Sequence, residues 1–174
     1  MATIAKGRAR PAYTISGNTP ELRYFPEGAN CSFKYGSIAF LNGSGRIRGV
    51  SRTGNVSPVE LGLIRGVAGL TTRNATPIAS WTADTKVGVW MANNDTVFSQ
   101  NIIGRTAALS TLSYGMIGSW MTASITGGGC SSWWLMRGNT ATGSIAYCRG
   151  FEDERNDTNG RVYFQFIHTI RNFR

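Results

Sequence analysis

The sequence has few acidic residues, few lysines and a single histidine. Of its 174 residues, 9 are Asp or Glu and 18 are Lys or Arg, which gives a formal net charge of +9. The charged fraction of 16% lies below the roughly one quarter that is usual for soluble domains. One histidine and scattered carboxylates do not assemble the nucleophile, base or metal-ligand patterns that enzyme sites use. We therefore expect a protein that is not an enzyme and that uses neither a cofactor nor a metal ion.

Long apolar runs are also missing. No stretch approaches the roughly 18 apolar residues of a membrane-spanning helix, and the N-terminal residues 1–14 lack the apolar centre of a secretion signal. We therefore expect a protein that is made in a cytoplasm and has no membrane partner. The three cysteines, Cys31, Cys130 and Cys148, are widely spaced and form no CxxC pair. This spacing predicts free thiols that are buried or half-buried.

Glycine, by contrast, is abundant, with 22 residues, and the apolar fraction of 41% is normal. Small and turn-forming residues replace the Lys, Glu and Leu that build long helices. From residue 31 onward, short apolar or alternating runs are separated by turn clusters. These runs are residues 31–35, 38–41, 46–50, 61–70, 77–81, 87–91, 96–103, 132–136, 145–149 and 161–170. The pattern predicts an all-β fold, a compact β-barrel or sandwich of short antiparallel strands.

Three local patterns refine this expectation. Asn42-Gly-Ser-Gly45 predicts the turn of a hairpin, because Asn and Gly tolerate positive φ angles. In the last run Val162, Phe164 and Phe166 share one face, and the single histidine, His168, follows them there, where a structural role is expected. A helical spacing of apolar residues occurs once, and Gly115 and Gly118 weaken it; the spaced residues are Ala108, Leu109, Leu112 and Met116.

The first 30 residues contain three prolines and little periodic apolar sequence. They predict an extended N-terminal arm over residues 1–30, followed by a β-rich globular domain over residues 31–174. The arm carries the main basic concentration of the chain, Lys6, Arg8 and Arg10. Of the 18 cations 15 are Arg, whose planar guanidinium group favours contacts at interfaces. We expect these three side chains to hold the arm on an acidic protein surface.

Aromatic and acidic residues mark two further candidates. Trp133 and Trp134 are adjacent on a predicted strand, so their side chains must point to opposite faces. Together with Arg137 they are a possible interface. The alternative is a core strand that is buried on both faces. The acidic stretch 152–157 lacks the spacing of a calcium loop and is followed by Asn159-Gly160. It predicts a solvated hairpin loop or an acidic contact for the arginines of a neighbour.

Several segments resemble the capsid decoration, or cement, proteins of tailed bacteriophages. The first segment has a polar entry, then Gly-x-apolar-x-x-Leu and a Gly-rich turn, and the last is a closing strand of the form Asp-x-Asn-Gly-Arg-Val. The matching segments are residues 28–47, 64–69, 87–92 with 94–98, and 157–166. Their order and spacing extend the resemblance over about residues 28–170. The chain departs from the family in its tryptophan-rich stretch 120–134 and in its excess of basic over acidic residues.

The resemblance implies a small β-rich virion structural protein that sits on the outer surface of a phage head, commonly as a homotrimer. Its partner would be the major capsid protein, and it would bridge adjacent capsomers to stabilise the shell. Two alternatives from other classes remain open. A single-stranded nucleic-acid-binding β-barrel fits the charge of +9, although the cations are too scattered to favour nucleic acid. A tail-associated glycan-binding module fits the exposed tryptophan that the pair 133–134 predicts.

Overall fold

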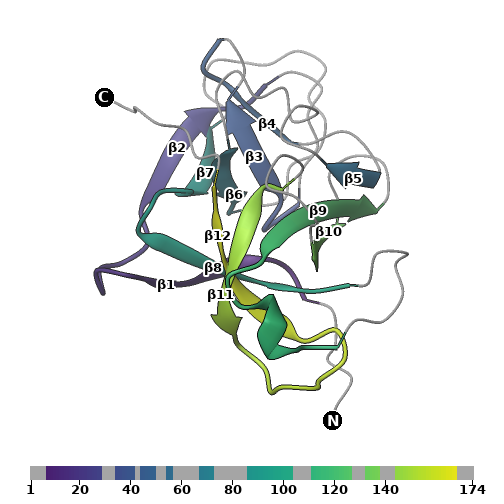
Figure 1. Cartoon of the computed structure of the whole chain (residues 1–174). Helices are drawn as coiled ribbons and strands as arrows, with labels where there is room; N and C mark the ends of the chain where they lie inside the picture. The colour runs from purple at the N-terminus through teal and green to yellow at the C-terminus, as the bar shows by residue number, and fades with distance from the viewer. Residues whose placement is uncertain are drawn as a thin grey trace.

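The computed structural model of the chain describes residues 7–28, 34–41, 44–49, 54–56, 67–72, 86–103, 111–126, 132–137 and 144–167. Within these ranges the protein is all-β, with strands arranged in two antiparallel sheets (Figure 1). The all-β prediction is confirmed. Among the described strands neither sheet closes into a barrel, so of the two predicted architectures the arrangement is that of a sandwich.

The larger sheet has seven strands. Six of them follow one another across the sheet in the order β1 (Arg10–Thr14), β8 (Thr96–Asn101), β12 (Arg161–Phe166), β11 (Ala146–Phe151), β9 (Trp120–Thr126) and β10 (Ser132–Arg137). The seventh strand, β5 (Gly54–Val56), pairs with the same edge of β9 as β11 does. β11 pairs with the start of β9, and β5 pairs with residues 123–125. A parallel bridge between Ile102 and Leu135 ties the end of β8 to β10, so the sheet curls toward itself.

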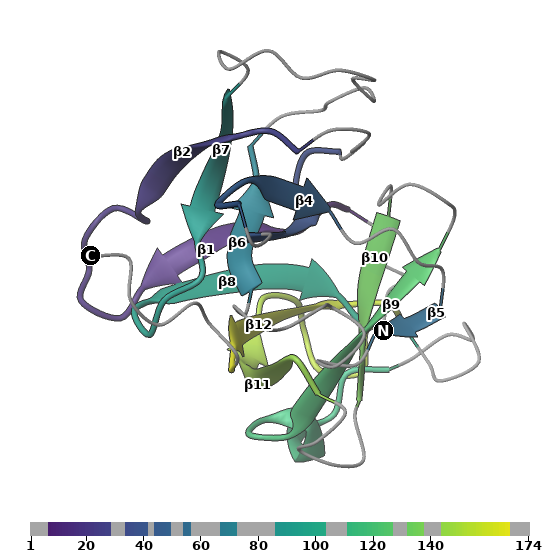
Figure 2. The same cartoon turned by 90° about the horizontal axis from the view of Figure 1, so that it is seen from above.

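Among the described residues the smaller sheet has five strands, and in Figure 2 it lies above β8, β12 and β11 of the larger sheet. Their order is β2 (Leu22–Pro26), β7 (Lys86–Met91), β6 (Val67–Thr71), β3 (Ile38–Leu41) and β4 (Ile47–Gly49). The predicted hairpin is confirmed, because Leu41 pairs with Ile47 and Ala39 with Gly49. The strands predicted within 87–91, 96–103, 132–136 and 145–149 are also present, and the strand predicted over 161–170 is present as β12 (Arg161–Phe166), which ends before Ile167.

Other sequence predictions differ from the structure or lie outside it. Lys34 and Tyr35 belong to a turn that precedes β3, not to a strand. The helical spacing over 108–116 yields only a 3-10 turn, η1 (Tyr114–Met116), because Thr111 pairs with Thr158 and the Leu112 amide donates to the Asp157 carbonyl at 3.1 Å. Residues 31–33, 61–66, 77–81, 108–110 and 168–170 lie outside the described ranges.

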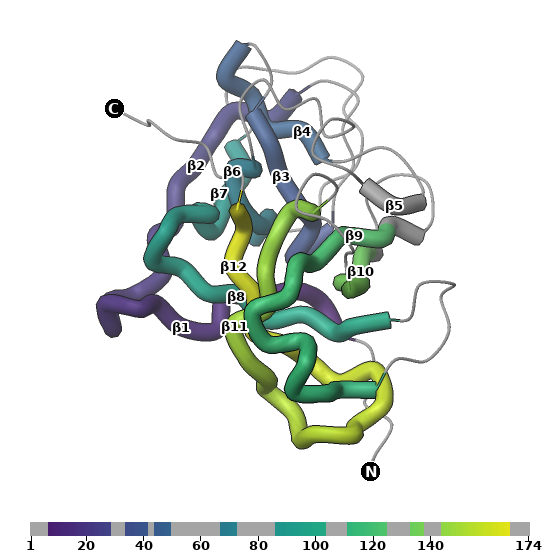
Figure 3. The backbone as a smooth tube through the Cα atoms, viewed as in Figure 1, coloured from purple at the N-terminus to yellow at the C-terminus, as the bar shows by residue number. Residues whose placement is uncertain are grey.

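Two connections run side by side from one sheet to the other. Residues 15–21 join β1 to β2, and residues 92–95 join β7 to β8 (Figure 3). The Ile15 amide donates to the Asp95 carbonyl at 2.9 Å, and the Met91 amide donates to the Glu21 carbonyl at 2.8 Å. The Asp95 carboxylate also accepts from the amide and the hydroxyl of Ser16 at 2.8 and 2.6 Å. These bonds fix the angle between the sheets at this corner.

An aromatic cluster fills the space between the sheets. Phe98, Phe164, Phe166 and Trp133 have ring centroids 5.1 to 6.4 Å apart and are almost completely buried. The Trp133 indole Nε1 donates to the Gly36 carbonyl at 2.7 Å, so a core residue of β10 is bonded to the turn that precedes β3. The alternation predicted for 161–166 is confirmed, since Val162, Phe164 and Phe166 all face this core.

The central strand of the smaller sheet, β6, is buried on both faces. Val67 and Leu70 of β6 face the aromatic cluster, whereas Ala68 belongs to a second cluster with Val87 and Val89. Between them Gly69 has a φ of +151°, and a Cβ atom there would lie 1.8 Å from the Trp90 carbonyl oxygen. The close approach of β6 to β7 therefore requires glycine at this position.

We predict that Gly69→Ala lowers the free energy of unfolding by at least about 2 kcal/mol, because the backbone of β7 must move away. Gly45→Ala is the matched control, since Gly45 also has a positive φ, of +74°, but nothing lies within 4 Å of its added Cβ. We expect the control to lower the free energy of unfolding by only about 1 kcal/mol, because alanine is strained at a positive φ. Urea unfolding followed by circular dichroism measures both, and equal losses would contradict the role given to Gly69.

Candidate functional site

The N-terminal segment supplies the outermost strand of both sheets. β1 pairs with β8 at one end of the larger sheet, and β2 pairs with β7 at one end of the smaller sheet. Within the described ranges β1 is paired along one side only, and so is β2 over Leu22–Pro26. Directly after β2, Glu27 forms a parallel bridge with Ile47 of β4. Residues 1–30, expected as an arm in front of a domain that starts at 31, therefore include two strands that lie in the sheets of the domain. The extended conformation is present, but its hydrogen bonds are made within this chain.

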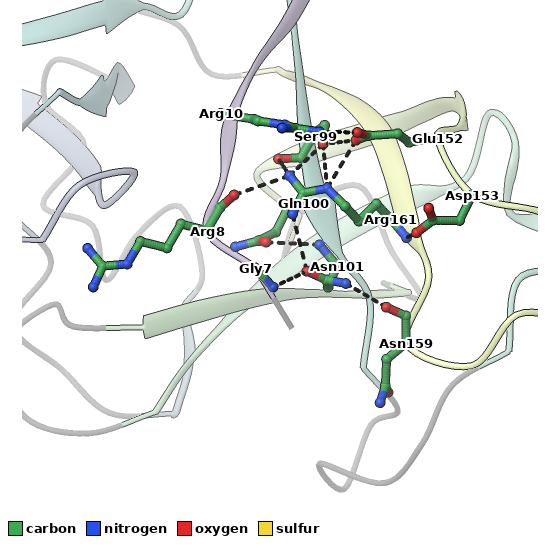
Figure 4. A network of polar contacts seen from close by, with 10 residues as sticks. All are labelled: Gly7, Arg8, Arg10, Ser99, Gln100, Asn101, Glu152, Asp153, Asn159 and Arg161. Atoms are coloured by element: carbon green, nitrogen blue, oxygen red, sulfur yellow. Dashed lines mark hydrogen bonds and ion pairs between the residues drawn. The ribbon is translucent and has the colours of Figure 1, made fainter. Parts of the chain in front are cut away.

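A polar network holds the start of this segment against the larger sheet (Figure 4). Its centre is Arg161 on β12. Arg161 Nε donates to Ser99 Oγ at 2.8 Å and Glu152 Oε2 at 3.0 Å, and Nη2 donates to the Arg8 carbonyl at 3.1 Å. Asn101 extends the network by accepting from the Gly7 amide at 2.7 Å and donating to the Asn159 carbonyl at 2.6 Å. One guanidinium thus joins β8, β12 and the N-terminal segment.

The opposite side of the segment packs against the turn before β3. Ala9 is 1% exposed and belongs to the main core cluster. A Cβ atom at Gly36, whose φ is +75°, would lie 2.4 Å from the Ala9 carbonyl oxygen. Only glycine at position 36 allows this contact. Residues 7–9 are therefore held between the Gly36 turn on one side and Arg161 on the other.

Glu152 is the acidic partner in this network. Its carboxylate accepts from Arg161, from the Ser99 hydroxyl and from Arg10, with which it also forms an ion pair. Partial burial alone would raise the pKa of Glu152, but the hydrogen bonds from Ser99, Arg161 and Arg10 outweigh it and hold that pKa below its ordinary value. Glu152 is therefore ionised at neutral pH and bound to two arginines.

Of the three cations that were expected to act together, the structure describes Arg8 and Arg10, and their side chains have different surroundings. Arg10 pairs with Glu152 of its own chain. Arg8 is exposed, and its side chain points away from the network while its carbonyl is held by Arg161 (Figure 4). Lys6 lies outside the described ranges. The acidic stretch 152–157 does form the loop between β11 and β12, and its arginine partners come from the same chain.

The tryptophan pair is also divided. Trp133 is 4% exposed and belongs to the core, because β10 turns this face toward Phe164 and Phe166, so it cannot form the interface that we expected of it. Trp134, on the other face, is half-buried, and Arg137 is exposed at the end of β10. Trp134, Trp133 and Arg8 line one recess, together with Gly7, Ala9, Tyr35, Gly36, Ser37 and Gln100. Its volume of about 20 Å³ is far below the roughly 300–1,000 Å³ of small-molecule sites.

The remaining candidates are structural or lie elsewhere. Cys148 is a free, buried thiol, and burial raises its pKa to about 11, so it stays protonated as a core residue. Cys31, Cys130 and His168 lie outside the described ranges. No group of three or more His, Cys, Asp or Glu side chains in the described ranges is arranged to hold a metal ion. Among the same residues no helix has the length and apolar character needed to cross a membrane.

Sequence reasoning missed an exposed apolar surface on the segment that bears both edge strands. Tyr13, Ile15, Leu22 and Tyr24 are between 43% and 64% exposed. We refer to these four residues as the N-terminal edge. The sequence does indicate this surface, because large apolar residues recur in the N-terminal segment without the alternation that would place them on a buried face. Exposed apolar residues beside unpaired strand edges mark protein-interaction sites.

Comparison of the chain with protein-family models, with curated proteins and with solved structures finds no match.

We predict that Glu152→Gln lowers the free energy of unfolding by about 2 kcal/mol at neutral pH, because charge-assisted hydrogen bonds in the network are lost. A carboxyl whose pKa is lowered by folding contributes stability above its unfolded value, near 4.5, and loses it as pH falls through the lower folded value. The difference in free energy of unfolding between the unaltered protein and Glu152→Gln should therefore become smaller below about pH 4. Urea unfolding at a series of pH values measures this difference.

Glu21→Gln is the matched control for this prediction. Glu21 pairs with Arg23 at 2.6 Å, but both side chains are more than 40% exposed. Exposed pairs contribute less than about 1 kcal/mol, so the control should change little. If Glu152→Gln lowers the free energy of unfolding no more than Glu21→Gln does, the polar network around Arg161 does not anchor the N-terminal segment.

Proposed function

We propose that this protein is a non-enzymatic virion structural protein, which binds the outer surface of a phage head and bridges adjacent capsomers to stabilise the shell. The observation that carries the proposal is the N-terminal edge. It joins the outermost strands of both sheets to four exposed large apolar side chains. The resemblance to capsid decoration proteins over about residues 28–170 supports the same conclusion.

The edge suits docking to protein for two physical reasons. A strand that is paired along one side offers a row of backbone donors and acceptors to a partner strand. Tyrosine, leucine and isoleucine beside it add apolar area, and aromatic residues commonly carry much of the free energy of binding at interfaces. The major capsid protein and further copies of this chain are the partners that we assign to it, with a homotrimer as the assembled form.

Bridging explains how a small protein stabilises a large shell. A decoration protein that contacts two capsomers, or a trimer that contacts several, forms its second contact at high effective concentration. Many individually weak contacts then add to a tight clamp. The arginine-rich charge of +9 fits an acidic capsid surface, and exposed Arg8, beside the first strand, is the described cation that we place there.

Point substitutions test this proposal better than truncation, because removing residues 1–25 would delete β1 and most of β2. We predict that Leu22→Asp combined with Tyr24→Asp weakens binding to undecorated phage heads by about a hundredfold, through the desolvation and repulsion of two added charges. Both positions are exposed, so the fold should persist. Co-sedimentation with undecorated heads measures occupancy, and analytical ultracentrifugation measures self-association.

Ile117→Asp is the matched control, since Ile117 is 49% exposed but lies beside η1 and far from β2 in the chain. It should leave occupancy unchanged. If heads do not bind the unaltered protein, the proposed function is wrong. If the double variant binds as well as the control, the docking surface is not the N-terminal edge.

A further inference from the structure

The outer face of the larger sheet carries aromatic side chains on β9 and β11. Trp120 lies directly opposite Tyr147 across this strand pair, so both side chains leave the sheet on the same face. The neighbours of Tyr147 along β11, Ala146 and Cys148, are buried in the core, which places Tyr147 and Trp120 on the side away from it. Trp120 is 40% exposed, and Tyr147 is half-buried.

Arg149 lies on the same face, because it follows Tyr147 by two residues on β11 and Cys148 between them points into the core. The register between β11 and β12 shifts at this point, between Cys148 and Gly150. The guanidinium carbon of Arg149 lies 4.5 Å from the centroid of the Tyr147 ring, within the range of a cation–π contact. We refer to Trp120, Tyr147 and Arg149 as the outer platform.

Gln165 on β12 positions two of the three platform side chains. Its Oε1 accepts from the Tyr147 hydroxyl at 2.8 Å and from Arg149 Nε and Nη2 at 3.1 and 2.6 Å. Its Nε2 donates to the Asn94 carbonyl at 2.6 Å, and the side chain is almost completely buried. A ligand that binds here therefore meets side chains that are already ordered, so little conformational entropy is lost on binding.

The charges on this face favour a neutral ligand. Among the described residues the larger sheet places two further cations on this face, Arg161 on β12 and Arg10 on β1, and both pair with Glu152. A nucleic-acid strand needs a row of cations to match its phosphates, in addition to aromatic rings on which its bases stack. Arg149 alone does not provide that row. The platform therefore lacks the charge that binding of single-stranded nucleic acid requires.

The platform combines a flat apolar surface with hydrogen-bond donors. The Trp120 indole presents an exposed ring, and a guanidinium group has five N–H donors, of which Gln165 engages those on Nε and Nη2. A ligand with an apolar ring face and several hydroxyl groups is complementary to both. We propose that the outer platform binds a neutral oligosaccharide, with one pyranose ring stacked on Trp120 and its hydroxyl groups hydrogen-bonded to Arg149.

This inference goes beyond the proposed function and does not depend on it. The N-terminal edge and the outer platform share no residue, and they lie on different strands. If both are used, a protein docked to a particle through its edge would carry a sugar-binding face as well. The two activities can be separated by mutation.

The full chain is titrated with four neutral hexasaccharides, built from β-linked glucose, α-linked glucose, N-acetylglucosamine and mannose, by isothermal titration calorimetry. We expect at least one to bind, with an affinity that does not change between about 50 and 200 mM salt. Trp120→Ala should weaken binding about tenfold or more, and Trp120→Phe should restore part of the loss. Arg149→Lys keeps the charge but not the planar donor pair, and should weaken binding several-fold.

Tyr24→Ala is the matched control, because Tyr24 is an exposed aromatic residue on the smaller sheet, and its loss should leave sugar binding unchanged. Trp120→Ala should in turn leave occupancy on phage heads unchanged, which separates failure of this proposal from failure of the proposed function. Absence of binding to all four sugars overturns the proposal, as does full binding by Trp120→Ala. Binding of oligothymidylate that falls steeply with salt would assign the face to nucleic acid instead.

Discussion

Arg161 connects parts of the chain that are far apart in sequence. From β12 it reaches the carbonyl of Arg8, the hydroxyl of Ser99 on β8 and the carboxylate of Glu152 in the loop after β11. This guanidinium holds the N-terminal segment against the larger sheet, together with the pairing of β1 with β8 and the hydrogen bond from the Gly7 amide to Asn101. Because its side chain is only 11% exposed, Arg161 must be neutralised, and Glu152 meets that requirement.

The same arrangement determines which surfaces remain for partners. With residues 7–9 held between Arg161 and the Gly36 turn, β1 and β2 become the outermost strands, and both carry exposed apolar side chains. Glu152 binds Arg10 and Arg161, so much of the charge near this edge is balanced within the chain. On the outer face Gln165 has the corresponding role for Tyr147 and Arg149. Glu152 thus orders two arginines near β1, and Gln165 orders two side chains of the outer platform.

Strands that alternate or that end in a clear turn could be predicted from the sequence. The hairpin of β3 and β4 follows from Asn42 to Gly45, and the two faces of β12 follow from the spacing of Val162, Phe164 and Phe166. β1 and β2 could not be predicted in this way, because they are edge strands in which most residues are exposed or half-buried. β9 does alternate, since Met121 and Ala123 are buried and Thr122 and Ser124 are half-buried, but our sequence prediction missed it.

The sequence by itself determined the all-β class, the opposite directions of Trp133 and Trp134, and the absence of a clustered catalytic or metal-ligating pattern from its residues. These properties depend on composition and on the period of a strand, which are local. Only the tertiary structure decided that Trp133 is the buried member of the pair, that Arg10 pairs with Glu152, and that Trp120, Tyr147 and Arg149 share a face. Each of these depends on strand order and register, which bring together residues that no local pattern connects.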